Sequence, residues 1–353
     1  MNPLTSSEQS HYQRHLILPG FGLEAQEKLK NFSVLVIGAG GLGCPVLMYL
    51  AAAGIGRIGI IDNDVVSQSN LHRQVLFGKS DIGKPKAKIA ANRLQDNNPY
   101  IVIEPILQYL SKENALEVIK KYDLVVDGSD NFSTRYLAND ACVMLGKPLV
   151  SGAIFTYEGQ VSVFNYKNGP TYRCLFPEPP SAGEMPNCAE IGVLGVLPGV
   201  VGSIMATEAI KIAAEIGETL SGKLLVYDAI KMNFNSFNFN ANPDNQNIRS
   251  LGKYDFACDV PSAKEISAKD LKAHFDDYVV MDVREPNEYQ TFNIEGLNCP
   301  LSELEFHLSS IPKDRKVVVH CQAGSRSKKA IELLETKYGY TNLINLRNGL
   351  KEW

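Results

Sequence analysis

The sequence predicts an α/β protein, in which a Rossmann-like, doubly wound mixed sheet is followed by a smaller α/β domain. Three observations support this prediction. A G-x-G-x-x-G loop directly follows an apolar run near residue 37, and apolar runs alternate with helical patterns up to about residue 150. A second, shorter alternation begins after an Asn-rich stretch at 240–249. Two α/β units joined by a linker follow from these patterns.

The first unit is built from short apolar runs. After one or two helices within 8–30, such runs occupy residues 32–37, 59–61, 101–105, 124–126 and 148–150. Parallel strands are buried on both faces and lack polar alternation, so these runs are expected to be parallel strands. Helical patterns fill the gaps at 45–53, 85–94 and 132–145.

The pattern changes near Thr156. Strands are expected at 160–164 and 224–227, with a Pro-rich connection between them. Apolar periodicity is then lost, so we assign 1–240 to the first domain, 241–262 to a linker and 263–353 to the second domain. In the second domain the patterns predict helices at 267–275 and 325–338 and strands at 278–283 and 316–320.

Charge and composition argue against several classes of protein. A formal net charge of −4 gives no support for a nucleic-acid partner or an anionic membrane surface. The N-terminus is polar, and the uncharged stretch 191–207 contains several glycines, so we expect a buried loop and helix there and no membrane span. Seven cysteines without a disulfide-framework spacing favour the cytoplasm.

The glycine-rich loop is the first candidate site. Gly38, Gly40, Gly41 and Gly43 lie between a strand and a helix, where a backbone turn and a helix N-terminus can hold phosphate. Asp62 ends the next strand, where a carboxylate can bind a ribose hydroxyl. By itself this fingerprint favours an NAD-dependent oxidoreductase.

Additional polar residues favour a triphosphate instead. The residues that follow along the chain are Asp64, Asn70, Arg73, Gln74 and Lys86. A dehydrogenase needs no cations directed at a terminal phosphate, whereas Arg73 and Lys86 suit the β- and γ-phosphates of ATP. Asp130 follows another strand and is placed to hold Mg²⁺ together with phosphate oxygens.

These motifs, in this order, resemble the HesA/MoeB/ThiF family of ubiquitin-activating-like adenylyltransferases, over about residues 8–235. The resemblance implies that ATP and Mg²⁺ bind at the residues named above. It further implies that Arg14, in His11-Tyr-Gln-Arg14, reaches the ATP of a partner subunit, and therefore that the protein is a homodimer.

Two cysteine positions are also interpreted through this resemblance. Cys188, in a Pro-bordered segment, corresponds to a cysteine that attacks the adenylate or forms a persulfide adduct in thiol-using relatives. Close relatives also bind structural zinc with two C-x-x-C pairs, but here the first position reads Thr171-Tyr-Arg-Cys174, and Cys258 is the one cysteine in 220–262. Two cysteines cannot form a Cys₄ site, so we predict no structural zinc.

The second candidate site is the segment His320-Cys321-Gln-Ala-Gly-Ser-Arg326. A cysteine between a strand and a helix, with Arg326 nearby, is placed to have a lowered thiol pKa. Cysteine-dependent phosphatases have five residues between Cys and Arg, whereas here there are four, so the smaller loop favours sulfane sulfur. The segment resembles the rhodanese active loop, and the resemblance covers about 263–353. It implies structural roles for Asp282 and Arg284, which orient the loop.

The combined hypothesis is an enzyme that adenylates the C-terminal glycine of a ubiquitin-like sulfur-carrier protein ending in Gly-Gly. Cys321 then carries persulfide sulfur from a donor such as a cysteine desulfurase, and a thiocarboxylate forms on the carrier. Carriers of this kind serve molybdenum-cofactor, thiamine and tRNA-thiolation routes. Two alternatives stay open, namely an NAD-dependent oxidoreductase with an accessory docking domain and an adenylyltransferase with a non-catalytic rhodanese module.

Overall fold

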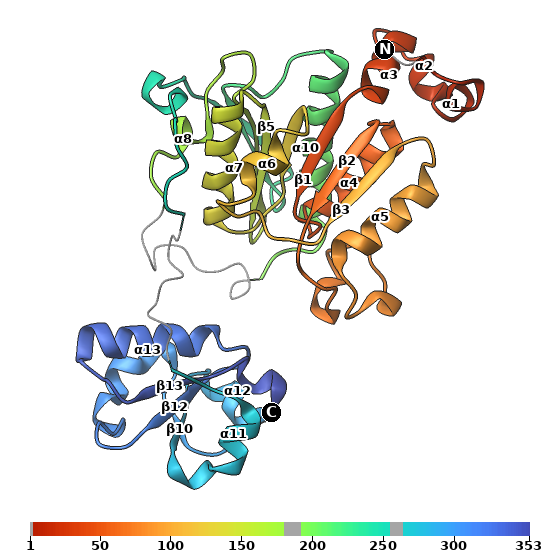
Figure 1. The fold of residues 1–353 in the computed structure, drawn as a ribbon. Coiled ribbons are helices and arrows are strands. Elements are labelled where there is room, and N and C mark those ends of the chain that lie inside the picture. The colour runs from red at the N-terminus through yellow and green to blue at the C-terminus, as the bar shows by residue number, and fades with distance from the viewer. Residues whose placement is uncertain (1–2, 180–191, 255–263) are drawn as a thin grey trace. The chain divides into compact units, whose positions relative to one another are not determined.

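The computed structural model describes residues 3–179, 192–254 and 264–353. It divides into two compact units, Met1–Phe256 and Ala257–Trp353 (Figure 1). Cys188 and Cys258 lie outside the described residues. The predicted α/β architecture, with a larger Rossmann-like sheet and a smaller second sheet, is confirmed.

The N-terminal unit contains an eight-stranded sheet in the order β3-β2-β1-β4-β5-β6-β7-β8. The first five strands in this order pair in parallel and the last three pair antiparallel. Their bounds are β1 Ser33–Ile37, β2 Arg57–Ile61, β3 Val102–Ile106, β4 Leu124–Asp127, β5 Leu149–Phe155, β6 Glu158–Phe164, β7 Lys223–Asp228 and β8 Asn233–Asn238. The parallel strands β1 and β4 therefore end side by side, with Ile37 opposite Asp127.

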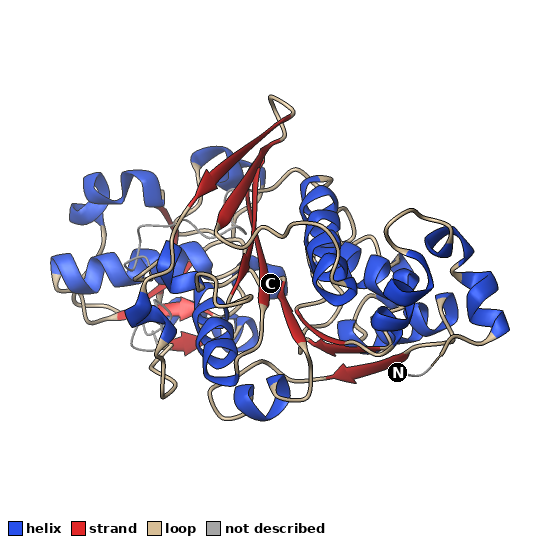
Figure 2. Ribbon diagram, turned by 90° about the horizontal axis from the view of Figure 1, so that it is seen from above, coloured by secondary structure: helices blue, strands red, loops and turns tan. Residues whose placement is uncertain are grey.

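Helices cover both faces of this sheet (Figures 1 and 2). One layer contains α3 Gly22–Lys30, α4 Gly43–Ala53, α5 Lys86–Asn97 and α10 Leu197–Ala214. The other contains α6 Ala115–Ile119 and α7 Phe132–Leu145, with α8 Tyr172–Leu175 against α7. Each layer closes its own apolar core. The short helices α1 Ser6–His11 and α2 Gln13–Leu16 precede α3.

The helix α10 is part of the core of this unit. By length and composition alone it could cross a membrane, since its mean hydropathy is 1.3 over 18 residues. However, 61% of that stretch is buried, and it packs on α4, β5 and β6. The uncharged stretch at 191–207 thus leads into a buried helix, as expected from its glycines and length.

The Asn-rich stretch is more ordered than the sequence indicated. A 3₁₀ helix spans Pro243–Gln246, and the Asn245 side-chain amide donates to the carbonyl of Arg173 at 3.0 Å. Leu251 and Tyr254 pack on the core beside α7. Residues 241–254, which we assigned to the linker, therefore pack on the N-terminal unit because their apolar and amide groups find partners there.

A buried carboxylate anchors the end of this stretch. Asp140 of α7 is 3% exposed, and Arg173 donates to both of its oxygens at 2.7 and 2.8 Å. The Tyr254 hydroxyl donates to the same carboxylate at 2.8 Å, as does the Asn139 amide at 2.9 Å. Asp140 therefore connects α7, α8 and the segment that precedes the second unit.

The C-terminal unit has a five-stranded parallel sheet in the order β11-β10-β12-β13-β9. Its strands are β9 Glu265–Ile266, β10 Val279–Asp282, β11 Leu297–Asn298, β12 Val317–His320 and β13 Leu343–Leu346. Its α-helices are α11 Ala268–Ala273, α12 Pro286–Thr291 and α13 Ser325–Tyr338. The ends of β10 and β12 lie side by side, with Asp282 opposite His320.

Replacing Asp140 with Ala should destabilise the N-terminal unit by about 3–5 kcal/mol, because Arg173 is left as a mostly buried, uncompensated charge. Circular dichroism follows both units, whereas fluorescence of Trp353, the only tryptophan, follows the C-terminal unit. We expect the transition seen only by circular dichroism to shift. The exposed Asp96→Ala control should change stability by less than about 0.5 kcal/mol; an equal shift in both variants would contradict the assignment.

Candidate functional site

The glycine-rich loop is shaped by close backbone contact. A Cβ added to Gly43 would lie 1.9 Å from the carbonyl oxygen of Gly38, so only glycine fits. Gly38 adopts φ +86°, and its N–H donates to the carbonyl of Ile61 at 2.9 Å. The loop leads directly into α4, whose N-terminus has no side-chain cap. The open N–H groups at this helix end can bind an anion.

Asp62 holds this loop in place. One carboxylate oxygen accepts the N–H of Ala39 and the other accepts the N–H of Asp64, each at 2.7 Å. Burial raises the pKa of Asp62, while these two hydrogen bonds and nearby Lys86 oppose the rise. Further lone pairs on the same carboxylate can accept ribose hydroxyls. The structure thus gives Asp62 a loop-ordering contact that the sequence did not suggest.

Asp64 and Lys86 form an ion pair at 2.9 Å. Lys86 is the first residue of α5 and is 5% exposed, whereas the Asp64 side chain is 55% exposed. The Tyr109 hydroxyl also donates to Asp64 at 3.3 Å. The pair fixes the position of the Lys86 ammonium, and the partly exposed Asp64 carboxylate compensates part of its charge.

The segment between β2 and α5 contains three more of the predicted residues, and two of them, Arg73 and Gln74, lie beside the loop. Asn70 accepts the N–H of Ser67 at 3.3 Å, and the Arg73 guanidinium donates to the carbonyl of Ser69 at 3.0 Å. Gln74 is 4% exposed, and its amide nitrogen lies 3.7 Å from where a Cβ on Gly40 would be. Its amide oxygen is buried without a hydrogen-bond partner.

A polar cluster on the other side of the loop was missed by the sequence analysis. Gly128 contacts Gly38, and the buried hydroxyl of Ser129 has no hydrogen-bond partner. Asp127 accepts the N–H of Ser129 at 3.0 Å, and Arg135 donates to the carbonyl of Ser129 at 2.7 Å. The sequence did carry a signal for this cluster. Polar side chains predominate in the four residues from Asp127 to Asp130, directly where a buried strand ends.

Asp130 lies at the exposed end of this segment. The next residue, Asn131, caps α7 by accepting the N–H of Thr134 at 2.8 Å. The described residues contain no group of three or more His, Cys, Asp or Glu side chains arranged as a metal site. One carboxylate fits Mg²⁺ well, because this ion commonly takes one or two protein carboxylates and completes its shell with phosphates and water.

Arg14 lies on α2 and is exposed, but both of its flanks are fixed. The Asn98 amide donates to the Tyr12 hydroxyl at 2.8 Å and to the carbonyl of Ala51 at 2.7 Å. On the other side, His15 and Gln26 share a hydrogen bond at 2.9 Å. The segment is thereby held on the end of α4, while Arg14 faces solvent.

Cys174 joins two turns that are far apart in sequence. Its sulfur accepts the N–H of Thr171 at 3.3 Å and the N–H of Asn242 at 3.2 Å. The Thr171 hydroxyl also donates to the carbonyl of Asn245 at 3.4 Å. Hydrogen bonds therefore connect these turns directly. The predicted absence of zinc stays a prediction.

Cys321 in the second unit lies between β12 and α13. Its sulfur accepts the N–H of Gly324 at 3.1 Å, and Gly324 adopts φ +88° immediately before α13. The residue is 1% exposed, whereas the next two loop residues, Gln322 and Ala323, are exposed. The Ser327 hydroxyl lies 3.7 Å from the sulfur. A backbone donor and a helix N-terminus thus favour negative charge on this sulfur.

Both arginines of the predicted loop site are paired with carboxylates. Arg326 donates to the two oxygens of Glu288 at 2.6 and 2.8 Å. Arg284 donates to Asp282 at 2.6 Å and to the Gln322 amide oxygen at 3.4 Å. Arg284 therefore contacts the loop through Gln322, and Asp282 holds Arg284. Arg326, expected to add positive charge, is instead compensated by Glu288.

His320 precedes Cys321 and is completely buried. Neither ring nitrogen has a hydrogen-bond partner, and Nε2 lies 3.9 Å from Asp282. Burial lowers the pKa of His320 to about 4, with Asp282 opposing and Arg284 reinforcing the shift. The imidazole is therefore neutral at physiological pH and contributes no charge beside the thiol.

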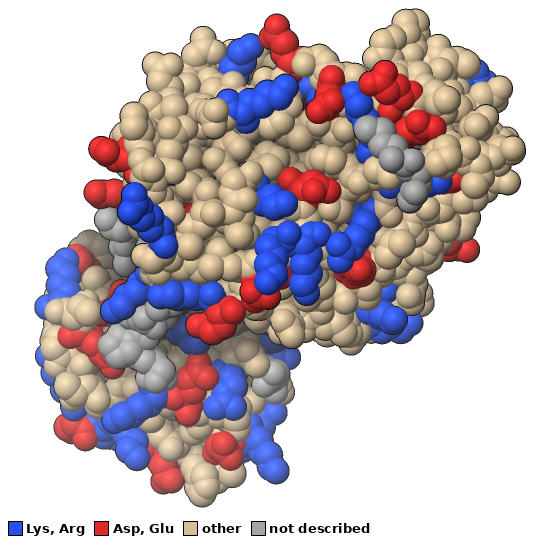
Figure 3. All heavy atoms as spheres, turned by 45° about the horizontal axis from the view of Figure 1, so that its top comes forward, with Lys and Arg blue, Asp and Glu red and all other residues tan. Residues whose placement is uncertain are grey.

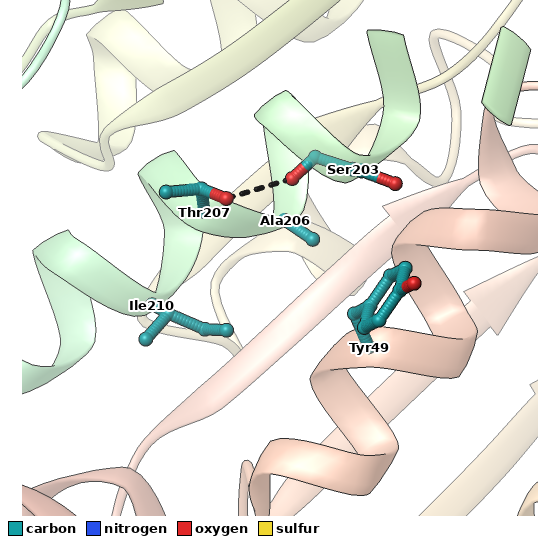
Figure 4. A pocket seen from close by; sticks show the side chains of 5 residues that line it. All are labelled: Tyr49, Ser203, Ala206, Thr207 and Ile210. Atoms are coloured by element: carbon teal, nitrogen blue, oxygen red, sulfur yellow. Dashed lines mark hydrogen bonds between the residues drawn. The ribbon is translucent and has the colours of Figure 1, made fainter. Parts of the chain in front are cut away.

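The surface carries charges of both signs and a small uncharged pocket. On the face in Figure 3, basic and acidic side chains are interspersed. A shallow pocket between α4 and α10 is lined by Tyr49, Ser203, Ala206, Thr207 and Ile210 (Figure 4). In it, Thr207 donates to the carbonyl of Ser203 within α10. The lining carries no charged group, so it lacks the chemistry of either site.

The fold and these two sites define a nucleotide-binding domain followed by a cysteine-loop domain. Residues 12–249 match the model of the ThiF family, and residues 267–353 match that of the rhodanese-like domain. The chain belongs to the ThiF family and carries a rhodanese-like domain. The resemblance inferred from the sequence is confirmed.

One similar protein matches nearly the whole of this chain, and two others match about two thirds to three quarters of it. The chain is 42% identical to a probable adenylyltransferase/sulfurtransferase MoeZ of Mycobacterium tuberculosis, over 99% of this chain and 94% of that protein. It is 53% identical to a sulfur carrier protein adenylyltransferase of Thermus thermophilus, over 72% of this chain and 98% of that protein. A crystal structure of E. coli MccB with ATP matches with a TM-score of 0.58 and 26% identity, covering 67% of this chain and 72% of that one.

The C-terminal unit should lose stability as the pH falls from about 6.5 towards 4. In this window the unfolded state protonates His320 whereas the folded state does not, which lowers the free energy of unfolding by about 3 kcal/mol. Denaturant unfolding followed by Trp353 fluorescence measures this dependence. A His320→Gln variant should show a shallower dependence; parallel curves for the two proteins would rule out His320 as the cause.

Proposed function

We propose that this enzyme adenylates the C-terminal carboxylate of a ubiquitin-like sulfur-carrier protein and then transfers persulfide sulfur to it. One observation carries the first half. Gln74 Oε1 and Ser129 Oγ are buried without partners on two sides of a glycine loop that ends at an uncapped helix N-terminus. Buried polar atoms without partners are costly, and a bound nucleotide would satisfy them.

The named residues divide the work of adenylation. The Gly38–Gly43 loop and the start of α4 hold phosphate, and Asp62 accepts ribose hydroxyls. The carrier carboxylate attacks the α-phosphorus of ATP, and the bond to the β-phosphate breaks, releasing pyrophosphate. Arg73 and Lys86 stabilise the charge that develops on the phosphates. Asp130 would hold Mg²⁺, which supplies further charge compensation when it is bound.

An NAD-dependent oxidoreductase fits these residues less well. The buried ammonium of Lys86 and the guanidinium of Arg73 both belong to the segment after the ribose carboxylate, where a dehydrogenase needs no such cations. Family membership and the similarity to adenylyltransferases support the same choice.

The second half of the reaction is assigned to Cys321. Its thiolate accepts sulfur from a persulfide donor such as a cysteine desulfurase, and the terminal sulfur attacks the acyl-adenylate, releasing AMP. Attack by a second thiol, for which Cys188 is the candidate, on the inner sulfur of the acyl disulfide then frees the carrier thiocarboxylate and leaves a disulfide, which a cellular thiol must reduce. The thiols must be free again at the start of each cycle, so we place the enzyme in the reducing cytoplasm.

We also propose a homodimer in which Arg14 acts on the partner subunit's ATP. Arg14 is exposed, while Tyr12 and His15 on either side of it are tied to Asn98 and Gln26. An arginine on an anchored segment loses less conformational freedom when it binds phosphate than one on a free arm. The Gly-Gly ending of the carrier and the pathway it serves are inferences from the family.

Carrier-dependent exchange of pyrophosphate into ATP should separate the two halves of the reaction. Asp130→Ala should reduce exchange by at least about 100-fold, because the metal loses its protein carboxylate. Cys321→Ala should leave exchange unchanged and abolish thiocarboxylate formation. Asp96→Ala serves as the matched surface control. Full exchange by Asp130→Ala, or none by the native enzyme with any Gly-Gly carrier, would refute the adenylation assignment.

Mixed dimers test whether Arg14 acts in trans. Arg14→Ala and Asp130→Ala chains should each be inactive alone, but a heterodimer contains one site with both residues intact. After subunit exchange, an equal mixture should recover about a quarter of the native exchange activity, since half of the dimers have one good site. If Arg14 acts on its own subunit, mixing will restore nothing.

A further inference from the structure

The charge balance around Cys321 is unusual for an oxyanion site. Arg326 ends the six-residue loop, and the Cys321 sulfur is close enough to contribute to its raised pKa, after the larger effect of Glu288. Yet both oxygens of Glu288 take hydrogen bonds from Arg326, at 2.6 and 2.8 Å. A bidentate pair of this kind cancels the charge and directs both terminal nitrogens at the carboxylate.

Glu288 is held in this position by its own helix. It is the third residue of α12, and its side chain accepts the N–H of Glu285 at 3.2 Å as part of a capping box. Its side chain is 34% exposed, and the Arg326 hydrogen bonds lower the pKa of Glu288. The carboxylate is therefore ionised and oriented by α12 before any ligand enters.

Two further cations of this unit also have carboxylate partners. Arg284 forms a buried pair with Asp282, and Lys328 pairs with Glu265 at 3.0 Å. His320 is neutral at physiological pH. The sulfur therefore receives stabilisation mainly from the N–H of Gly324 and the start of α13. Such dipoles stabilise one negative charge on sulfur, whereas a dianion calls for an available cation.

We propose that Glu288 is a specificity-determining residue, which neutralises Arg326 and thereby selects sulfane sulfur carried on thiols over dianionic donors such as thiosulfate. This inference rests on the proposed sulfur transfer by Cys321. With a thiol-bound donor, the Cys321 thiolate attacks the outer sulfur of R–S–SH, the donor S–S bond breaks, and R–S⁻ leaves. With thiosulfate, the same attack releases sulfite, and two negative charges must enter the loop.

The test measures loading of Cys321 in the full-length chain by mass spectrometry, with thiosulfate or cysteine persulfide as donor. Glu288→Gln keeps the capping acceptor but releases the charge of Arg326. We expect the KM for thiosulfate to fall about tenfold, with the maximal loading rate changed less than about twofold. The KM for cysteine persulfide should stay within about twofold. Inorganic phosphate should also inhibit loading at an about tenfold lower concentration.

Two further variants make the test specific. Glu285→Gln removes a neighbouring carboxylate that binds Ser302 rather than Arg326, and it should behave like the native enzyme. Adding Arg326→Gln to Glu288→Gln should restore the native KM for thiosulfate. The proposal is overturned if Glu288→Gln leaves the KM for thiosulfate unchanged, changes both donors equally, or is matched by Glu285→Gln.

The role of Glu288 can be tested separately from sulfur transfer by Cys321. If Cys321 loads from neither donor, sulfur transfer itself is refuted. Phosphate protection of Cys321 against iodoacetamide then still tests the electrostatic argument. Protection that does not strengthen in Glu288→Gln overturns the role of Glu288 in that case too.

Discussion

The nucleotide half of the molecule depends on one close contact, in which the backbone at Gly43 approaches the carbonyl of Gly38 so closely that a Cβ would lie 1.9 Å from it. This contact sets the angle at which α4 leaves β1. The uncapped start of α4, the Asp62 contact with Ala39 and the place of Gln74 beside Gly40 all depend on that angle. A side chain at Gly43 would displace the helix and with it both walls of the site.

The same helix, α4, links the glycine-rich loop to the N-terminal segment that carries Arg14. The start of α4 follows the glycine-rich loop, and the carbonyls of Ala51 and Ala53 near its end accept hydrogen bonds from Asn98 and Gln26. Those side chains hold Tyr12 and His15, between which Arg14 lies. In the proposed dimer, one rigid helix therefore supports a subunit's own nucleotide loop and the arginine it offers to its partner.

In the second unit, the charges around Cys321 are the main constraint. A thiolate needs stabilisation, but excess positive charge would also attract common oxyanions. Here the backbone N–H of Gly324 meets the sulfur directly, while Glu288 and Asp282 compensate Arg326 and Arg284. The buried, neutral His320 adds no charge. Backbone dipoles therefore stabilise the sulfur, while the arginines around the loop are paired with carboxylates.

The sequence by itself determined the α/β class, the two-part organisation and most of the element positions. Helices at 132–145 and 325–338 agree with α7 and α13 because strong apolar periodicity and terminal glycines are local signals. Only the tertiary structure decided which distant polar side chains pair. The Arg326–Glu288 pair spans 38 residues and the Asp140–Tyr254 contact spans 114, so no local pattern specifies either of them. Likewise, Gln74 and Ser129 became candidates only once folding had buried their oxygens without partners, because burial depends on how distant segments pack.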